Sequence, residues 1–269
     1  MTRSLALGLL GLSLFTSCGE QAPPKKNVVL IVIDTLRADR MSLYGGERST
    51  TPAIDEWARR GAVFERANSA SSWTVPSMGM LLTGRYRHGS GKTLSESQRL
   101  LSQVLQGAGY RTACIGKWHL GTTMQTRDGK VQGLTNVDYT KPLLVGPNDY
   151  GFDESFILPG SLDMYPYVFV RNHEFVGKVT ARKGWSAFNR VGPAAEDFLD
   201  TEVLSTFCAE AGKFIADEAK KKKPFFLFVA LTAPHTPSSP EPPFEGKSPI
   251  GVYGDFVINT VACIGWRRD

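Results

Sequence analysis

Three short segments with the composition of β-strands constrain the fold of this 269-residue chain more than any other feature. Residues 28–33 are six consecutive apolar, mostly β-branched residues, and similar strand-like segments lie at 110–115 and 225–231. Apolar runs of this length indicate strands buried on both faces of a parallel sheet. Helical patterns separate them, at 51–60, after a capping-box sequence at 95–98, and at about 202–221. The alternation predicts an α/β fold, with a mostly parallel central sheet and helices on both faces.

Polar residues follow each of these segments. Asp34 comes directly after the first, Lys117 and His119 end the second, and His235 follows the third. The carboxyl ends of parallel strands meet at one edge of a sheet, where ligands bind. If the second strand persists, Lys117 and His119 share its parity and point the same way. Singly, the aspartate is also explained as a helix cap and each histidine as a structural residue, but together these residues indicate a functional site.

A further candidate lies in the segment 73–85, where Thr74 stands just before a helix that Pro76 is expected to start. Proline suits the first turn of a helix, because its missing N–H would have no partner there. The unpaired N–H groups and the dipole at a helix N-terminus attract tetrahedral anions such as sulfate or phosphate. The segment is therefore typical of a nucleophile beside an anion site. An ordinary helix start, with Leu81 and Leu82 in the core, is the alternative.

Three motifs give these residues a family resemblance. They are Pro-Ser…Leu-Thr-Gly-Arg within 76–85, Gly-Lys-Trp-His-Leu-Gly at 116–121 and Ala-Pro-His-Thr-Pro at 233–237. Together they resemble the sulfatase branch of the alkaline phosphatase superfamily, from residue 27 to about residue 256. Members of that family have a large α/β sandwich fold and hydrolyse sulfate or phosphate esters with a bound divalent metal. The resemblance therefore implies a hydrolase acting on sulfate, or phosphate, monoesters of small molecules or glycans.

The resemblance also implies a role for each candidate residue. Asp34 is expected to be a metal ligand, and Thr74 to occupy the nucleophile position and to be a possible second ligand. Lys117, His119 and His235 are expected to surround the transferred oxyanion, with Lys117 and His235 binding it. The expected ion is Ca²⁺, with Mg²⁺ and Zn²⁺ as alternatives.

Three positions depart from the family pattern. Sulfatases carry Cys or Ser at the position of Thr74, and an enzyme converts that residue to formylglycine, whose hydrate attacks sulfur. Threonine cannot be oxidised to this aldehyde, so no formylglycine is expected here, and Thr74 would react as an alkoxide. Met78 stands in place of the family's arginine, and Thr35 in place of a second acidic ligand. A phosphoesterase or phosphotransferase with a threonine nucleophile is therefore an alternative function.

The carboxyl-terminal end departs further. Residues 251–257 resemble the family's continuation into a long helix, whereas 258–269 do not follow the family sequence. The family's remaining metal ligands, an Asp followed by Asn or His before a Gly, have no counterpart here. We expect a frameshift or premature stop near residue 257, which would make this the amino-terminal portion of a sulfatase. An inactive, vestigial protein with at most oxyanion binding is the alternative.

The amino terminus has the pattern of an export signal. Arg3 precedes an apolar run at residues 5–15, and Cys18 follows. This is typical of a lipoprotein signal at 1–17, with lipidated Cys18, a tether at 18–27 and an α/β domain at 28–269. The expected location is the cell envelope, periplasmic or on the outer surface, with membrane attachment through the lipid. Secretion is the alternative if Cys18 is not lipidated.

The remaining composition limits other classes of function. Cys114, Cys208 and Cys263 are an odd number without close spacing, which argues against a disulfide framework or a zinc site. The net charge of +5, from 31 basic and 26 acidic residues, is too small to predict a nucleic-acid partner. The one dense basic run, at 220–223, is better explained as a helix end.

The segment 122–193 has little periodicity and is interpreted as an insertion that shapes the substrate pocket. Its aromatic residues are candidates for stacking on a sugar or aryl group, with buried packing as the alternative for each: Tyr165, Tyr167 and Trp185.

Overall fold

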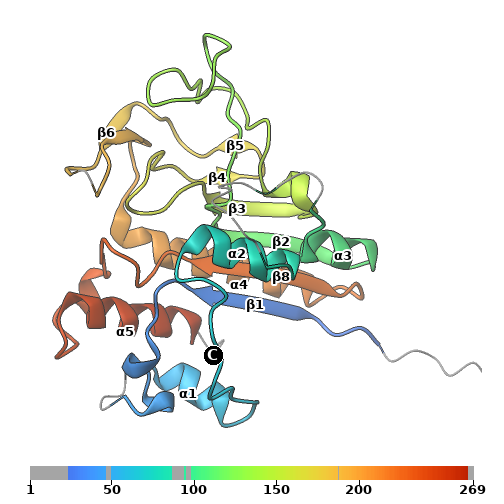
Figure 1. Ribbon diagram of the computed structural model, residues 1–269, viewed down its shortest axis with the longest axis vertical. Coiled ribbons are helices and arrows are strands. Elements are labelled where there is room, and N and C mark those ends of the chain that lie inside the picture. Colours follow the sequence, from blue (N-terminus) through green and yellow to red (C-terminus); the bar gives the residue numbers. More distant parts are fainter. Residues whose placement is uncertain (1–23, 47–49, 87–93, 95–97, 187, 266–269) are drawn as a thin grey trace, which may run out of the picture.

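The computed structural model describes residues 24–46, 50–86, 94, 98–186 and 188–265. The expected signal, Cys18 and residues 95–97 of the expected capping box lie outside these residues. Figure 1 shows a central sheet with loops of the segment 122–193 above it and helices α1 (Pro52–Ala58) and α5 (Val252–Ile264) below. This segment was interpreted as an insertion with little periodicity, but it supplies three strands of the sheet, at 154–158, 170–171 and 174–175.

The sheet has six strands in the order β1-β8-β2-β3-β4-β5. The first four in this order run parallel, and β4 and β5 are antiparallel additions at one edge. The mostly parallel sheet predicted from the sequence is therefore confirmed. The strand bounds are β1 Val28–Ile33, β2 Arg111–Lys117, β3 Glu154–Leu158, β4 Val170–Arg171, β5 Glu174–Phe175 and β8 Phe225–Leu231.

Alternate residues of the central strand β8 enter two different hydrophobic clusters. Residues of one parity, such as Phe225 and Leu227, pack with α4 (Val203–Glu218) and α5 (Val252–Ile264). Those of the other parity, such as Phe226 and Phe228, belong to the cluster that contains residues of α2 (Thr74–Thr83) and α3 (Leu101–Gly107). Helices thus cover both faces, as predicted. Burying one such phenylalanine contributes about 1.5–3 kcal/mol to the free energy of folding, so the side chains of β8 stabilise both faces of the sheet.

The remaining elements are short. Helix α1 (Pro52–Ala58) contacts α5. A separate antiparallel ribbon, β6 (Ala181–Lys183) with β7 (Gly192–Ala194), lies outside the main sheet. Five 3₁₀ helices are described, at Ala38–Arg40, Ser42–Tyr44, Pro147–Tyr150, Asp200–Glu202 and Pro242–Phe244.

Helix α5 forms the carboxyl-terminal end of the described structure and carries a disulfide that was not expected. It continues to Ile264, through most of the segment that departs from the family sequence. Cys263 on this helix forms a disulfide with Cys208 on α4, so the expectation of no disulfide was wrong. The two cysteines are 55 residues apart in sequence, but packing of α4 on α5 brings their Cα atoms to 6.0 Å. Cys114 is the free cysteine and is buried in the core, as expected.

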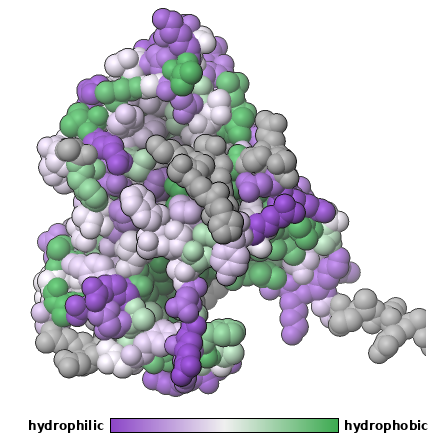
Figure 2. Space-filling view, in the orientation of Figure 1, coloured by the Kyte–Doolittle hydropathy of each residue, from purple (hydrophilic) through white to green (hydrophobic). Residues whose placement is uncertain are grey.

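The basic run at 220–223 lies at a helix end, as expected. Helix α4 ends at Glu218, and the lysines 220–223 follow it, with Lys221 paired to Glu218 at 2.7 Å. Hydrophilic and hydrophobic residues are intermixed on the face drawn in Figure 2. Among the helices described, none has the length and apolar character needed to cross a bilayer.

Candidate active site

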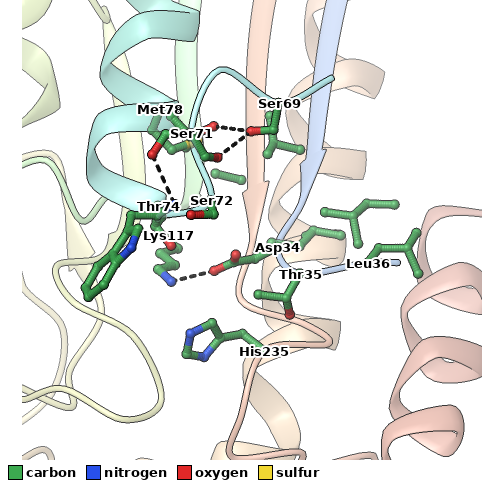
Figure 3. A pocket seen from close by; sticks show the side chains of 16 residues that line it. Asp34, Thr35, Leu36, Ser69, Ser71, Ser72, Thr74, Met78, Lys117 and His235 are labelled. Carbon is green, nitrogen blue, oxygen red and sulfur yellow. Dashed lines mark hydrogen bonds and ion pairs between the residues drawn. The ribbon is translucent and has the colours of Figure 1, made fainter. Parts of the chain in front are cut away.

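All but one of the predicted site residues converge on one cavity at the carboxyl edge of the sheet, and His119 is the exception. The cavity has a volume of about 450 Å³ and is lined from β1, β2, the loop after β8 and the start of α2. Figure 3 shows Asp34, Lys117, Thr74 and His235 around the same space. Strand order explains the convergence, because β1, β8 and β2 are neighbours and parallel. Other lining residues include Thr35, Ser69, Ser71, Ser72, Trp73, Ser77 and Met78.

An ion pair crosses the floor of this cavity. The Nζ of Lys117 lies 2.5 Å from Oδ2 of Asp34, and the two side chains are 2% and 14% exposed. An isolated buried ammonium group would be costly, so the carboxylate stabilises it. The pair spans β8, because Asp34 follows β1 and Lys117 ends β2. This pairing was not predicted, since each residue was assigned its own ligand.

Gly116 lets Lys117 reach this position. Gly116 has a φ of +116°, and a Cβ built there would lie 1.9 Å from the carbonyl oxygen of Ala230. A larger residue would force β2 away from β8, because that oxygen belongs to the backbone. The first glycine of the Gly-Lys-Trp-His motif therefore keeps the lysine close to the central strand.

The turn after β1 is held by a contact from α5. Thr35 has a φ of +59°, a left-handed conformation that is uncommon for threonine. The hydroxyl of Tyr253 donates a hydrogen bond of 3.1 Å to the carbonyl oxygen of Thr35. Helix α5 thus supports the turn that presents Asp34 to the cavity.

Thr74 lies at the first residue of α2, with Trp73 as the N-cap. The helix therefore begins two residues before Pro76, which is its third residue rather than its start. The N–H groups of Thr74 and Val75 have no acceptor within the helix, because they belong to its first turn. The half-buried Thr74 side chain lines the cavity at this end of the helix. A hydroxyl beside free amides and a lysine suits an attack on a tetrahedral oxyanion.

Met78, at the position of the family's arginine, faces both the cavity and the core. It is 5% exposed and belongs to the hydrophobic cluster beneath α2. An apolar side chain there gives no charge to an anion. Among the described residues that line the cavity, Lys117 is thus the one lysine or arginine.

His119 lies near the other charged groups but is not among the residues that line the cavity. Strand β2 ends at Lys117 and His119 has a φ of +53°, so the strand does not persist and the condition for shared parity with Lys117 is not met. Burial, followed by the charge of Lys117, lowers the pKa of His119 from 6.5 to about 4, while Asp163 opposes this shift. The Nδ1 atom is buried without a hydrogen-bond partner in the described structure. At neutral pH this imidazole is uncharged and can accept a proton.

His235 lines the cavity from the loop after β8. Its Nδ1 lies 2.6 Å from the carbonyl oxygen of Thr236. A carbonyl only accepts, so Nδ1 carries the proton and Nε2 keeps its lone pair in the neutral ring. The histidine is thereby oriented by its own loop.

A polar wall opposite Asp34 was not predicted from the sequence. The hydroxyl of Ser69 donates to the carbonyl oxygen of Ser71 at 2.7 Å and lies 2.9 Å from the hydroxyl of Ser77. These serines, together with Ser72, line the cavity beside Thr74. The available signal was the Ser-Ala-Ser-Ser run just before the helix start.

The described residues only partly fit the expected divalent metal. No group of three or more His, Cys, Asp or Glu side chains suited to a metal occurs within the described ranges. Asp34 supplies one carboxylate, already paired with Lys117, whereas Ca²⁺ takes six to eight oxygen ligands. The hydroxyls of Thr74 and Thr35 are neutral and weaker ligands. This part of the chain therefore does not form a complete metal site by itself.

A family model described as Sulfatase matches residues 26–260. The chain belongs to the sulfatase family. An N-acetylgalactosamine-6-O-sulfatase of Bacteroides thetaiotaomicron is 27% identical to it over 96% of this chain and 59% of that protein. The human N-acetylgalactosamine-6-sulfatase is 29% identical over 91% of this chain and 46% of that protein. The family match extends a few residues beyond the end expected near residue 256.

Solved structures agree with this sulfatase fold. A structure from work on glycosaminoglycan metabolism by Bacteroides thetaiotaomicron superimposes with a TM-score of 0.76 at 26% identity, over 90% of this chain and 58% of that one. A Vibrio parahaemolyticus protein of the alkaline phosphatase superfamily shares the fold with a TM-score of 0.54 at 20% identity. The chain spans about half the length of the curated relatives it matches.

Proposed function

We propose that this sulfatase-family protein hydrolyses sulfate monoesters of glycans by attack of the Thr74 hydroxyl at sulfur. The observation that carries the proposal is the convergence of Thr74, Asp34, Lys117 and His235 on one cavity. Relatives named as N-acetylgalactosamine-6-sulfatases support a sulfated amino sugar as the substrate.

In the proposed reaction, the sulfate group lies between the first turn of α2 and Lys117. The amides of Thr74 and Val75, the Lys117 ammonium and His235 stabilise negative charge on its oxygens. The Thr74 oxygen forms a bond to sulfur as the bond from sulfur to the sugar oxygen breaks. The neutral imidazole of His119 takes the Thr74 proton and, as an acidic imidazolium, passes it to the departing sugar oxygen, so the sugar leaves as its alcohol.

Release of product is the difficult step for a threonine. Water must attack the sulfated Thr74, because threonine lacks the hemiacetal route open to formylglycine. Phosphate esters pass this step more readily, since water attacks a phospho-enzyme at phosphorus. A phosphoesterase with a threonine nucleophile is therefore the second candidate function, and Thr74 is the observation that favours it. No formylglycine is part of either proposal.

A divalent metal at Asp34, with Ca²⁺ the proposed ion, and Mg²⁺ or Zn²⁺ as alternatives, would supply Lewis-acid stabilisation of the oxyanion when bound. Asp34 is the proposed ligand and Thr74 a possible second one. Further ligands would have to come from outside the described residues. If no further metal ligands are supplied, we expect the protein to bind an oxyanion without turning over an ester.

We also propose an exported protein held at the cell envelope through lipidated Cys18, or secreted if Cys18 is not lipidated. The disulfide between Cys208 and Cys263 supports export, because such bonds form and persist in oxidising compartments.

The test uses the purified chain with three substrates: N-acetylgalactosamine 6-sulfate, 4-nitrophenyl sulfate and 4-nitrophenyl phosphate, each with Ca²⁺, with Mg²⁺ or with EDTA. We expect Thr74→Ala to abolish turnover and Thr74→Ser, which keeps the hydroxyl, to retain part of it. Phosphate turnover far above sulfate turnover would favour the second candidate. Undiminished turnover by Thr74→Ala would exclude this nucleophile, and sulfate binding without any turnover would favour the oxyanion-binding outcome.

A further inference from the structure

Trp73 is a large aromatic residue at the mouth of the active-site cavity. It lines the cavity, directly precedes the nucleophile Thr74, and is 77% exposed. Tryptophans are usually largely buried, because their side chains contribute a large apolar area. A tryptophan left open to solvent beside a nucleophile therefore needs a physical explanation.

The backbone of Trp73 is held in one conformation. As the N-cap of α2 it is extended, with φ −114° and ψ 139°. Its N–H donates to the hydroxyl of Ser71 at 3.2 Å, and its carbonyl oxygen accepts from the N–H of Ser77 at 3.0 Å. The indole thus projects from a positioned residue, and less conformational entropy is lost when a ligand binds it.

Among the described residues, no aromatic or cation–π contact involves the Trp73 indole, and its Nε1–H donates no hydrogen bond there. Two other tryptophans in the described part of the chain are exposed, Trp57 at 45% and Trp185 at 68% of their surface. Neither of them lines the cavity. Trp73 therefore combines a flat apolar face, a free donor and a place beside the reacting group.

We propose that Trp73 is a stacking platform for the pyranose ring that carries the sulfate ester. This rests on the proposed function, and it adds the residue that recognises the sugar. An ester held at Thr74 places its carbon skeleton one residue away from the indole, at the open side of the cavity. The C–H groups on one face of a pyranose form an apolar surface that matches an indole face. The ring hydroxyls then meet the serine wall made by Ser69, Ser71 and Ser72.

Trp73 takes the place of the aromatic residue expected in the segment 122–193. Tyr167 is fully buried, with its hydroxyl donating to the carbonyl oxygen of Arg190 at 2.7 Å. Tyr165 is partly buried against the core. Trp185 is exposed but does not line the cavity. The platform therefore comes from the nucleophile segment itself.

The test measures binding by calorimetry to wild-type protein, Trp73→Ala, Trp73→Phe and the matched control Trp185→Ala. The probes are N-acetylgalactosamine 6-sulfate, unsulfated N-acetylgalactosamine and inorganic sulfate. We expect Trp73→Ala to weaken binding of the sulfated sugar about tenfold, with Trp73→Phe retaining most of it. Inorganic sulfate should bind all four proteins alike, and Trp185→Ala should match wild type.

The outcomes separate the platform from the proposed function. Equal weakening of sulfate and sulfated sugar by Trp73→Ala would overturn the platform, because the residue would then act on the anion site. Unchanged binding of the sulfated sugar to Trp73→Ala would overturn it as well. If wild type fails to bind inorganic sulfate but binds the unsulfated sugar through Trp73, the platform stands and the proposed function fails.

Discussion

At the scale of single residues, the ion pair between Asp34 and Lys117 shows how this site balances two requirements. A buried ammonium beside the cavity supplies positive charge for an oxyanion, yet it must be stabilised while the cavity holds no anion. Asp34 performs that second task at 2.5 Å. The same carboxylate is the proposed metal ligand, so metal binding and the lysine compete for it. The charge balance of the cavity is therefore set by very few groups.

We expect Asp34→Asn to lower the free energy of unfolding by about 3 kcal/mol, because it leaves the buried Lys117 charge without its partner. Urea unfolding at pH 7 measures the change. The matched control is Asp39→Asn, whose partner Arg37 lies on the exposed surface. That control should change stability little. Equal effects of the two variants would show that the Lys117 charge is stabilised by other groups.

The buried His119 predicts a pH dependence of stability. Its pKa is lowered from 6.5 to about 4, so between these pH values the unfolded chain binds a proton that the folded chain does not. Stability should therefore fall as pH drops from 6.5 towards 4, by up to about 3 kcal/mol, and be unaffected by this group above pH 6.5. NMR titration of the His119 ring measures the pKa directly.

His119→Gln should remove that part of the pH dependence, while His173→Gln, at a partly exposed pair with Asp149, serves as the control. A measured pKa of His119 near 6.5 would contradict the burial argument.

At the scale of elements, α5 links the carboxyl-terminal end to the active site. Tyr253 on its first turn supports the turn that carries Asp34, and Cys263 near its last turn is tied to α4. The helix is therefore held in place near both of its ends. Loss of either contact should loosen the turn after β1 as well as the helix.

The disulfide gives a direct prediction at this scale. Cys208→Ser should lower the free energy of unfolding by roughly 2–4 kcal/mol, because the unfolded chain gains the freedom of a 55-residue loop. Cys263→Ser should have a similar effect, and the double variant should add little to either single one. Reducing agent should destabilise wild type but not the double variant. Equal sensitivity of both proteins to reducing agent would mean that the bond does not form in solution.

At the scale of the whole molecule, the chain forms two hydrophobic layers on one sheet, with the site at the edge where the strands end. Its curated relatives are about twice as long. The proposed attachment at the cell envelope depends on Cys18, which is far in sequence from most of the active-site residues.

We expect Cys18→Ser to shift the protein from the membrane fraction to a soluble one, since lipidation of Cys18 is the proposed anchor. The described part of the chain holds no helix able to cross a bilayer, which takes roughly 20 apolar residues. Fractionation of cells, followed by immunoblotting, measures the shift, and Cys114→Ser is the control. Retention of Cys18→Ser in membranes would point to another means of attachment.

The sequence by itself determined the three central strands β1, β2 and β8, their parallel arrangement and most of the site, whereas β3, β4 and β5 lie in the segment interpreted as an insertion. Apolar runs and the polar residues after them are local patterns, so Asp34, Lys117 and His235 were predicted to share an edge and do line one cavity. Thr74 was predicted from its place before a helix, although the helix begins at Thr74 itself.

Only the tertiary structure decided how these groups interact. The Lys117–Asp34 pair, the contact of Tyr253 with the turn after β1, and the disulfide join residues from 55 to 218 positions apart. Local periodicity carries no information about such contacts, because they depend on how β1, β2, α4 and α5 pack. The direction of His119 likewise depended on a backbone turn that ended β2 early. The exposure of Trp73 could be known only once the cavity beside it had formed, because a tryptophan in a sequence predicts burial.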